Sequence, residues 1–127
     1  MNSGPVVSET FSRDDRLRKR REFEECYASG VRASGRHIQV FLLAAGGPSP
    51  RTRLGISVPR RVGSAVLRNR VRRRLREIFR RTRGLFGQAT VSVVVNARPS
   101  AAAALFQDLA ADYASVVQQG LARLGRP

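Results

Sequence analysis

The chain has 127 residues, enough for one domain, and 24 Lys and Arg against 9 Asp and Glu give it a net charge of +15. A compact domain with that surplus repels itself unless a polyanion is near, so a nucleic acid is the leading partner. The single cysteine, Cys26, excludes an internal disulfide and a cysteine-based zinc site. The longest apolar runs, 40–45 and 93–95, are too short to span a bilayer, and residues 1–10 show no secretory signal. We therefore expect a cytoplasmic protein with no membrane partner.

The N-terminal segment predicts no regular structure. Residues 1–15 show little hydrophobic periodicity, so we expect a disordered tail before a single domain over residues 16–124. A helix is predicted over residues 17–29, because apolar side chains recur there at helical spacing: Phe23, Cys26 and Tyr27. Gly30 is placed to end that helix.

Strand patterns follow the first helix. Residues 31–33 predict a short strand and residues 36–44 a longer one. One face of the longer strand is apolar throughout: Ile38, Val40 and Leu42. Its other face is mixed, which indicates partial cover: His37, Gln39, Phe41 and Leu43. A loop is expected over residues 46–50, and residues 54–58 alternate again as a third strand.

The second half of the chain predicts two longer helices around a central strand. Ser64 is placed as the N-cap of a helix that ends by Gly84, with one apolar stripe: Leu67, Val71, Leu75, Ile78 and Phe79. Residues 89–95 are apolar on both faces, as in a central strand. A last helix opens at Pro99 and buries Leu105, Leu109, Tyr113, Val116, Val117 and Leu121. The order α-β-β-β-α-β-α predicts the α+β class, an α/β sandwich with helices packed on a four-stranded sheet.

The second predicted helix concentrates the positive charge. Residues 60–83 contain eleven arginines and one acid, Glu77. Helical geometry places a polar set opposite the buried Val71: Asn69, Arg73, Arg76 and Arg80. Solvated faces usually mix charges, because like-charged pairs at i,i+4 cost about 0.2–0.5 kcal/mol each. We therefore interpret this face as a polyanion-binding surface, with a solvated face as the alternative. No zinc-finger, basic-zipper or paired recognition-helix pattern favours DNA over RNA.

Groups that could carry catalysis are few. His37 is the only histidine, it has no identifiable partner set, and we expect it to be a strand-surface residue. Asp14 and Asp15 lie in or near the predicted tail, and Asp108 and Asp112 share a helix face with no histidine or further acid evident. The sequence therefore predicts no catalytic and no metal-binding residues in this chain.

One block resembles a known family. Residues 61–79 read RVGSAVLRNRVRRRLREIF, with Arg68-Asn69-Arg70 at the centre. This block resembles the signature of the protein subunit of bacterial ribonuclease P. Residues 53–58 resemble the strand before that signature, and residues 95–99 resemble the segment before the family's last helix. The similarity extends over about residues 17–124, in the same order of elements.

The resemblance implies a fold and a function. The fold is an α/β sandwich related to a ribosomal-protein domain, with a left-handed β-α-β crossover against the usual rule. The enzyme is a ribonucleoprotein that cuts precursor tRNA to release the 5′ leader. Its RNA subunit holds the Mg²⁺-dependent active site, and the protein alone is inactive. The protein binds that RNA and the single-stranded leader of precursor tRNA.

The resemblance also assigns residues to the two RNAs. The Arg-Asn-Arg helix and the turn before it would face the RNA subunit: Arg60, Arg61, Arg68, Asn69, Arg70, Arg72, Arg73 and Arg76. Three aromatic residues would line a leader cleft between the first helix and the sheet: Phe23, Tyr27 and Phe41. Stacking on aromatic rings tolerates any base, which suits leaders of varied sequence. The alternative for these rings is ordinary core packing.

Two other function classes stay open. A general RNA-binding, RNA-chaperone or ribosome-associated protein would not depend on one folded RNA. A basic DNA-compacting protein would bind duplex DNA with comparable affinity.

Overall fold

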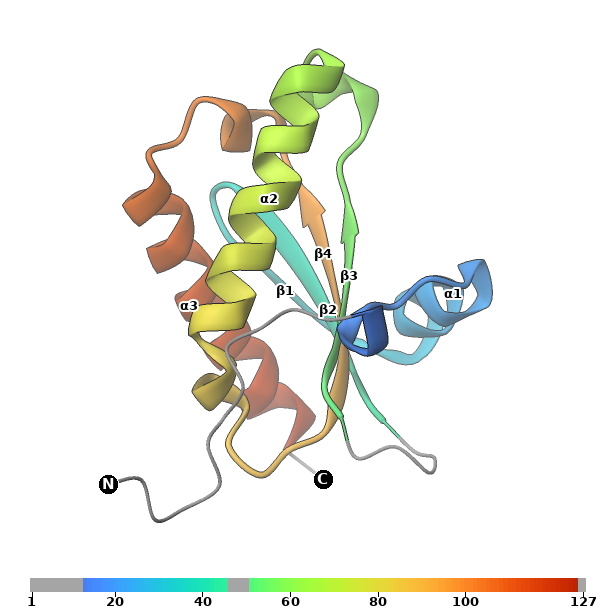
Figure 1. The fold of residues 1–127 in the computed structure, drawn as a ribbon. Helices are drawn as coiled ribbons and strands as arrows, with labels where there is room; N and C mark the ends of the chain where they lie inside the picture. The colour runs from blue at the N-terminus through green and yellow to red at the C-terminus, as the bar shows by residue number, and fades with distance from the viewer. Residues whose placement is uncertain (1–12, 46–50, 126–127) are drawn as a thin grey trace, which may run out of the picture.

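Within residues 13–45 and 51–125, which the computed structural model describes, four strands form one mixed sheet and three α-helices pack on its two faces (Figure 1). The elements are, in order, α1 (Arg20–Ser29), β1 (Val31–Ser34), β2 (Ile38–Ala44), β3 (Arg53–Ser57), α2 (Ala65–Arg81), β4 (Val91–Ala97) and α3 (Phe106–Leu124). Four short 3-10 turns accompany them: η1 (Arg13–Asp15), η2 (Arg60–Val62), η3 (Arg83–Phe86) and η4 (Pro99–Ala102).

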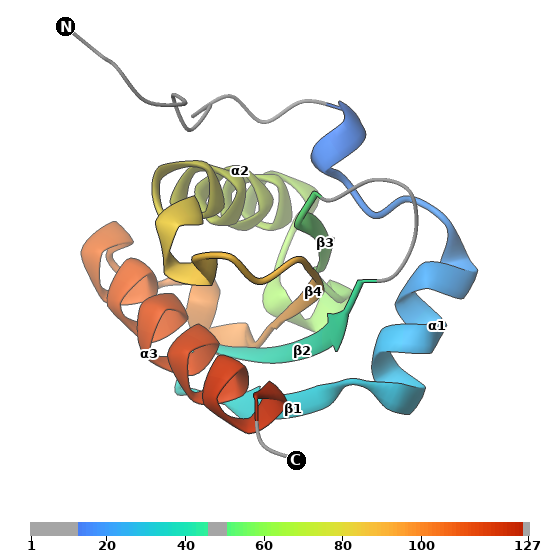
Figure 2. The ribbon, with the colours of Figure 1, turned by 90° about the horizontal axis from the view of Figure 1, so that it is seen from below.

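The strands lie in the order β1-β2-β4-β3. β2 is antiparallel to both β1 and β4, whereas β3 is parallel to β4 and joined to it through α2. Seen from the α2 side with both strands pointing up, β4 lies to the left of β3 (Figures 1 and 2). The crossover is therefore left-handed, and the predicted α+β sandwich is confirmed.

The main hydrophobic core lies between the sheet and the layer of α2 and α3, while α1 covers the opposite face (Figure 2). The predicted apolar face of β2 is fully buried in this core, at 0% exposure for Ile38, Val40 and Leu42. The predicted stripe of α2 is buried too, apart from the half-buried Leu67 at its start. Periodicity thus identified which face of each element points inward.

The last helix begins later than its pattern predicted. Residues from Pro99 form η4, and Leu105 is the N-cap of α3 in extended conformation, with 60% of its surface exposed. The assignment of Leu105 to the buried stripe is therefore wrong, because the chain turns outward between the two helical segments. The buried Ala101 of η4 contributes to the core there. None of the described helices is long and apolar enough to cross a membrane.

The prediction of a disordered tail over residues 1–15 is wrong for its last three residues. Residues 13–15 form η1, and Asp15 is buried with ion pairs to Arg51 at 2.7 Å and Arg83 at 2.8 Å. The chain then runs extended beside β3, where the backbone N–H of Leu17 donates to the carbonyl of Leu54 at 2.9 Å. α1 therefore starts at Arg20 rather than at residue 17. The rest of the predicted tail, residues 1–12, and the predicted loop 46–50 lie outside the described residues.

The turn into α2 depends on a glycine and a serine. Gly63 has φ +151°, a backbone conformation that side chains rarely adopt. A β-carbon there would also lie 2.9 Å from a methyl carbon of Leu67. The hydroxyl of Ser64 accepts a hydrogen bond from the backbone N–H of Leu67 at 3.3 Å, so the predicted N-cap is confirmed. This turn places η2 and its two arginines at the N-terminal end of α2.

Candidate nucleic-acid interface

The arginines of α2 divide into two groups by their partners. Near the C-terminal end, Glu77 accepts hydrogen bonds from Arg80, at 2.6 Å for the shorter one, and from Arg81 at 2.7 Å. The hydrogen bonds from Arg80 and Arg81 lower the pKa of the Glu77 carboxyl. In contrast, residues 60–76 contain no acidic residue at all. The positive charge of η2 and of most of α2 is therefore not balanced within that stretch.

The residues predicted to bind the RNA subunit lie together on η2 and on the first two-thirds of α2. Five of them are exposed: Arg60, Arg61, Asn69, Arg70 and Arg73. Three are half-buried: Arg68, Arg72 and Arg76. The partial positive charge at the N-terminal end of α2 adds to the same potential. The structure thus brings all eight side chains onto one continuous stretch of surface.

Local hydrogen bonds orient two of the half-buried arginines. Nε of Arg68 donates to the carbonyl of Gly63 at 3.2 Å, and Nη1 of Arg72 donates to Oδ1 of Asn69 at 3.0 Å. Each guanidinium has five N–H donors, so one such bond leaves others for phosphate oxygens. Arg74 differs from this group, because its Nη1 donates to the carbonyl of Ala104 and links α2 to the segment before α3.

Two of the three predicted leader-binding aromatic residues form a pair on the opposite side of the sheet. The rings of Tyr27 on α1 and Phe41 on β2 meet edge to face, with centroids 4.9 Å apart and an interplanar angle of 84°. The hydroxyl of Tyr27 donates to Oδ1 of Asn96 on β4 at 3.0 Å. Tyr27 is 40% exposed, so part of its ring is available to a ligand.

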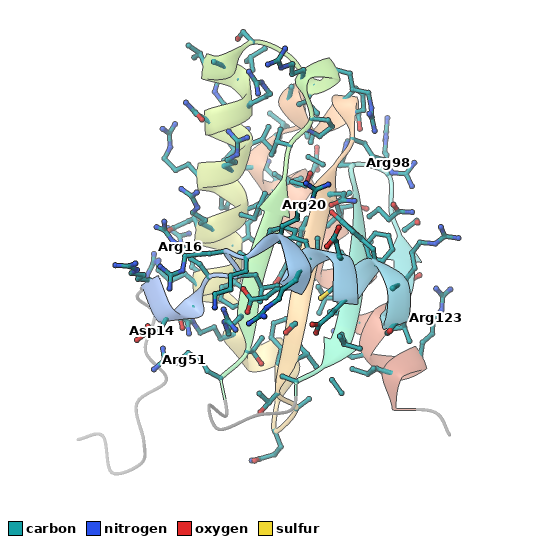
Figure 3. The ribbon with its side chains drawn as sticks, turned by 90° about the vertical axis from the view of Figure 1, so that its right-hand side faces the viewer. Asp14, Arg16, Arg20, Arg51, Arg98 and Arg123 are labelled. Carbon is teal, nitrogen blue, oxygen red and sulfur yellow. The ribbon has the colours of Figure 1, made fainter. Side chains whose placement is uncertain are left out.

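Next to this pair, the sheet presents a polar row that sequence reasoning missed. Strand register aligns four side chains from all four strands in that row: Ser34, Gln39, Asn96 and Ser57. We call Tyr27, Phe41 and this row the α1–sheet surface. Figure 3, which looks onto α1, labels Arg20 at the start of that helix and Arg98 just after β4. The polar residues that alternate with apolar ones along each strand could have indicated this row. Aligning residues of four strands into one row, however, requires the strand order.

Phe23, the third predicted aromatic residue, lies deeper than Tyr27. It packs with Leu17, Cys26 and Val94 in a small second core between α1 and the sheet, and its side chain is half-buried. Core packing therefore accounts for much of the Phe23 ring. The structure leaves its role in leader binding a prediction.

Glu22 fixes the start of α1 and so the positions of both aromatic residues on it. Its carboxylate accepts hydrogen bonds from the backbone N–H groups of Arg18 and Lys19, and pairs with Arg53 of β3 at 2.7 Å. Burial alone would raise the pKa of Glu22, but the hydrogen bonds and the Arg53 charge together lower it below the ordinary value. This carboxylate therefore fastens α1 to the edge of the sheet.

The groups considered for catalysis have structural partners. Nδ1 of His37 and the hydroxyl of Ser100 form a 2.8 Å hydrogen bond, and the same hydroxyl lies 3.2 Å from the carbonyl of Arg36. Asp112 accepts the backbone N–H groups of Arg36 and His37, which closes the β1–β2 turn. Among the described residues, no three His, Cys, Asp or Glu side chains lie together in a group that could hold a metal ion.

Comparisons with known proteins agree with one another. The sequence model of the family described as "Ribonuclease P" matches residues 11–120. The chain is 42% identical over 98 residues to a "Ribonuclease P protein component" of Acidothermus cellulolyticus, covering 77% of this chain and 81% of that relative. It is 38% identical over 111 residues to the protein of the same name from Arthrobacter sp. strain FB24, covering 87% and 80% of the two chains.

Solved structures give the same result. The RNase P protein of Staphylococcus aureus has a TM-score of 0.74 to this chain at 27% identity, covering 83% of this chain and 94% of that one. The RNase P protein from Thermotoga maritima has a TM-score of 0.73 at 29% identity, covering 82% and 96%. The fold and the sequence thus point to one family.

Proposed function

Because this chain belongs to the family of bacterial ribonuclease P protein components, we propose that it holds two RNAs at once. It binds the catalytic RNA subunit through η2 and α2, and the 5′ leader of precursor tRNA through the α1–sheet surface. The protein is part of a ribonucleoprotein of tRNA processing, and its contribution is to position substrate rather than to perform the cleavage.

The observation that carries the proposal is the unbalanced charge of residues 60–76, which contain no acid and whose arginines are exposed or half-buried on η2 and α2. An RNA backbone supplies the missing negative charge, and guanidinium groups pair with phosphate oxygens in a bidentate fork. Phosphate contacts position a protein on folded RNA without reading its bases. This surface therefore suits the large, structured RNA subunit.

The α1–sheet surface suits a single strand instead. The partly exposed Tyr27 ring offers a stacking platform, and Arg20 lies at the start of the same helix (Figure 3). Gln39 and Asn96 add hydrogen-bonding groups from the sheet. Since the two surfaces lie on opposite sides of β3 and β4, the protein can contact both RNAs without competition between them.

The proposal assigns catalysis and Mg²⁺ to the RNA subunit. Among the described residues, no three His, Cys, Asp or Glu side chains lie together in a group that could hold a metal ion, and the proposal places Mg²⁺ on the RNA subunit. We derive no cleavage step through groups of this chain.

Reconstitution tests the proposal. Protein, RNA subunit and precursor tRNA are combined in all pairs and together at low Mg²⁺, and 5′ cleavage is followed. We expect cleavage by the complete mixture, none by the protein with precursor tRNA, and tighter binding of precursor than of mature tRNA by the holoenzyme. Cleavage by RNA-free protein would refute the assignment of catalysis. Equal affinity for an unrelated folded RNA or for duplex DNA would favour a general RNA-binding or a DNA-compacting protein.

A further inference from the structure

A small pocket of about 110 Å³ lies where the N-terminal segment, α2 and the edge strand β3 meet. Three arginines line it: Arg16 from the N-terminal segment, and Arg72 and Arg76 from α2. The rest of its lining is apolar: Leu17, Phe23, Leu54 and Ile56. Among the described residues that line the pocket none is acidic, so the pocket combines strong positive charge with an apolar floor.

Arg16 is held at this pocket by its neighbours on both sides. Before it, Asp15 is buried in its ion pairs with Arg51 and Arg83. After it, the backbone of Leu17 is hydrogen-bonded to β3, and the carbonyl of Arg16 itself accepts a hydrogen bond from Arg53 at 3.1 Å. Figure 3 shows Arg16 beside α2. Its backbone position is therefore fixed by the fold rather than by a ligand.

The guanidinium of Arg76 is close enough to those of Arg16 and Arg72 to be repelled by both. Arg76 is half-buried, and its burial, followed by the positive charges of Arg16 and Arg72, lowers its pKa below the ordinary value. Arginine does not lose its proton in proteins, so the repulsion persists in the free protein. A bound anion would relieve it.

We propose that Arg16, Arg72 and Arg76 form a binding pocket for one phosphate group of an RNA strand, with the attached nucleoside over the apolar floor at Phe23 and Ile56. Three arginines that line one small pocket can donate to the oxygens of one phosphate, and guanidinium planes and an aromatic ring can stack on a base. Only the identity of the RNA that supplies the phosphate rests on the proposed function. The anion-binding pocket itself does not. It adds Arg16, which the sequence did not single out, to the RNA-binding residues.

The pocket connects the two proposed RNA surfaces. Arg72 and Arg76 belong to the residues proposed for the RNA subunit, whereas Phe23 lies on α1 beside the α1–sheet surface. A phosphate in this pocket therefore comes from the RNA subunit or from the leader end of precursor tRNA. The chemistry of recognition is the same for both.

Inorganic phosphate tests the pocket without any RNA. Melting temperatures are compared in sodium phosphate and in sodium chloride of equal ionic strength, because an anion that binds the native state raises the melting temperature. The variants are Arg16→Gln and Arg76→Gln, and the matched control is Arg18→Gln, which removes a charge from the same segment outside the pocket. We expect wild type and control to gain equally from phosphate, and the two pocket variants to gain less than half as much. Equal gains in all four proteins would overturn the pocket.

RNA binding then identifies the source of the phosphate. We expect Arg16→Gln to weaken binding about tenfold in one of two titrations, RNA subunit with protein or precursor tRNA with holoenzyme. Because Arg16 and Arg76 contact one phosphate, the double variant should lose less affinity than the product of the two single losses. The inference would be overturned if Arg16→Gln lost no more affinity than Arg18→Gln in both titrations. It would also be overturned if the double variant lost as much affinity as the product of the two single losses. If wild type failed to bind the RNA subunit, the proposed function would fail, while the phosphate titration would still decide the pocket.

Discussion

The ring of Phe23 occupies the space that a side chain at Gly55 would need, since a β-carbon at position 55 would lie 2.6 Å from Cζ of Phe23. Helix α1 can therefore approach β3 closely only because that strand has a glycine at this point. The contact determines how α1 sits on the sheet, and with it the position of Tyr27 one turn further along the helix. A strand residue thus controls the geometry of the proposed leader-binding surface, to which it contributes no side chain.

Gly55→Ala should destabilise the domain by about 1–3 kcal/mol, because the added methyl group forces Phe23 out of its place. Chemical denaturation measures the change in the free energy of unfolding. Gly84→Ala is the matched control, because a β-carbon at that position would meet no heavy atom within 4 Å beyond its immediate chain neighbours. Equal stabilities of the two variants would contradict the packing described here.

Asp15→Asn should destabilise the domain by about 3 kcal/mol, because it removes the buried carboxylate that pairs with Arg51 and Arg83. Urea unfolding measures the loss. Asp14→Asn removes the same charge from the exposed neighbouring residue and should cost much less. Similar losses in both variants would mean that only the overall charge balance matters.

Cys26 should make stability fall in alkaline solution. Burial, followed by the charges of Glu25 and Glu22, raises the pKa of its thiol from the ordinary value of 9.0 to about 11. Between these two pH values the unfolded chain releases the thiol proton and the folded chain retains it, so stability decreases as pH rises. The loss amounts to roughly 2–3 kcal/mol by pH 11. Below pH 8 the thiol keeps its proton in both the folded and the unfolded chain, so no stability is lost through Cys26.

The measurement is the free energy of unfolding at several pH values from 8 to 11. Cys26→Ala removes the titrating group and should flatten the decline relative to wild type. A decline of equal size in both proteins would assign it to other groups.

Arg68→Ala, Arg70→Ala and Arg73→Ala should each weaken binding to the RNA subunit and leave the fold intact. Each lost phosphate contact should reduce the slope of log affinity against log salt by about one unit. Arg81→Ala is the control, because Arg81 is paired with Glu77 within α2. Unchanged affinity and slope in all three variants would place the RNA-subunit interface elsewhere.

Tyr27→Ala should weaken holoenzyme binding of precursor tRNA by about 1–3 kcal/mol, as expected for one stacked base. Binding of mature tRNA, which has no leader, should barely change. Tyr27→Phe keeps the ring and loses only the hydrogen bond to Asn96, so it should retain most of the affinity. A thermal melt of each variant separates binding from stability. Equal losses for precursor and mature tRNA would refute the leader-binding role.

Part of the candidate site could be predicted from the sequence, and part could not. Most arginines of residues 60–76 lie on α2, so helical periodicity sufficed to separate its arginine-rich surface from its buried stripe. The pairing of Tyr27 with Asn96 joins residues 69 positions apart, and it follows from the strand order and from the position of α1. No local sequence pattern predicts a contact between two residues so far apart in the chain.

The N-terminal segment shows the same division. Its composition predicted disorder up to residue 15, yet Asp15 is paired with Arg83, 68 positions away, and Leu17 just after it is hydrogen-bonded to β3. A charged residue in a polar segment carries no sign that it will be buried, because its burial depends on cations that the fold brings to it. The pocket at Arg16 was missed for this reason.

By itself, the sequence determined the order and inward faces of the helices and strands, the concentration of arginine on one helix, and the family signature. These depend on periodicity, charge and motif, which are properties of neighbouring residues. Only the tertiary structure decided which strands align into a polar row, which carboxylate is buried, and which three arginines meet beside an apolar floor. Each of these depends on contacts between distant segments, and such contacts exist only once the sheet order and the packing of the helices are established.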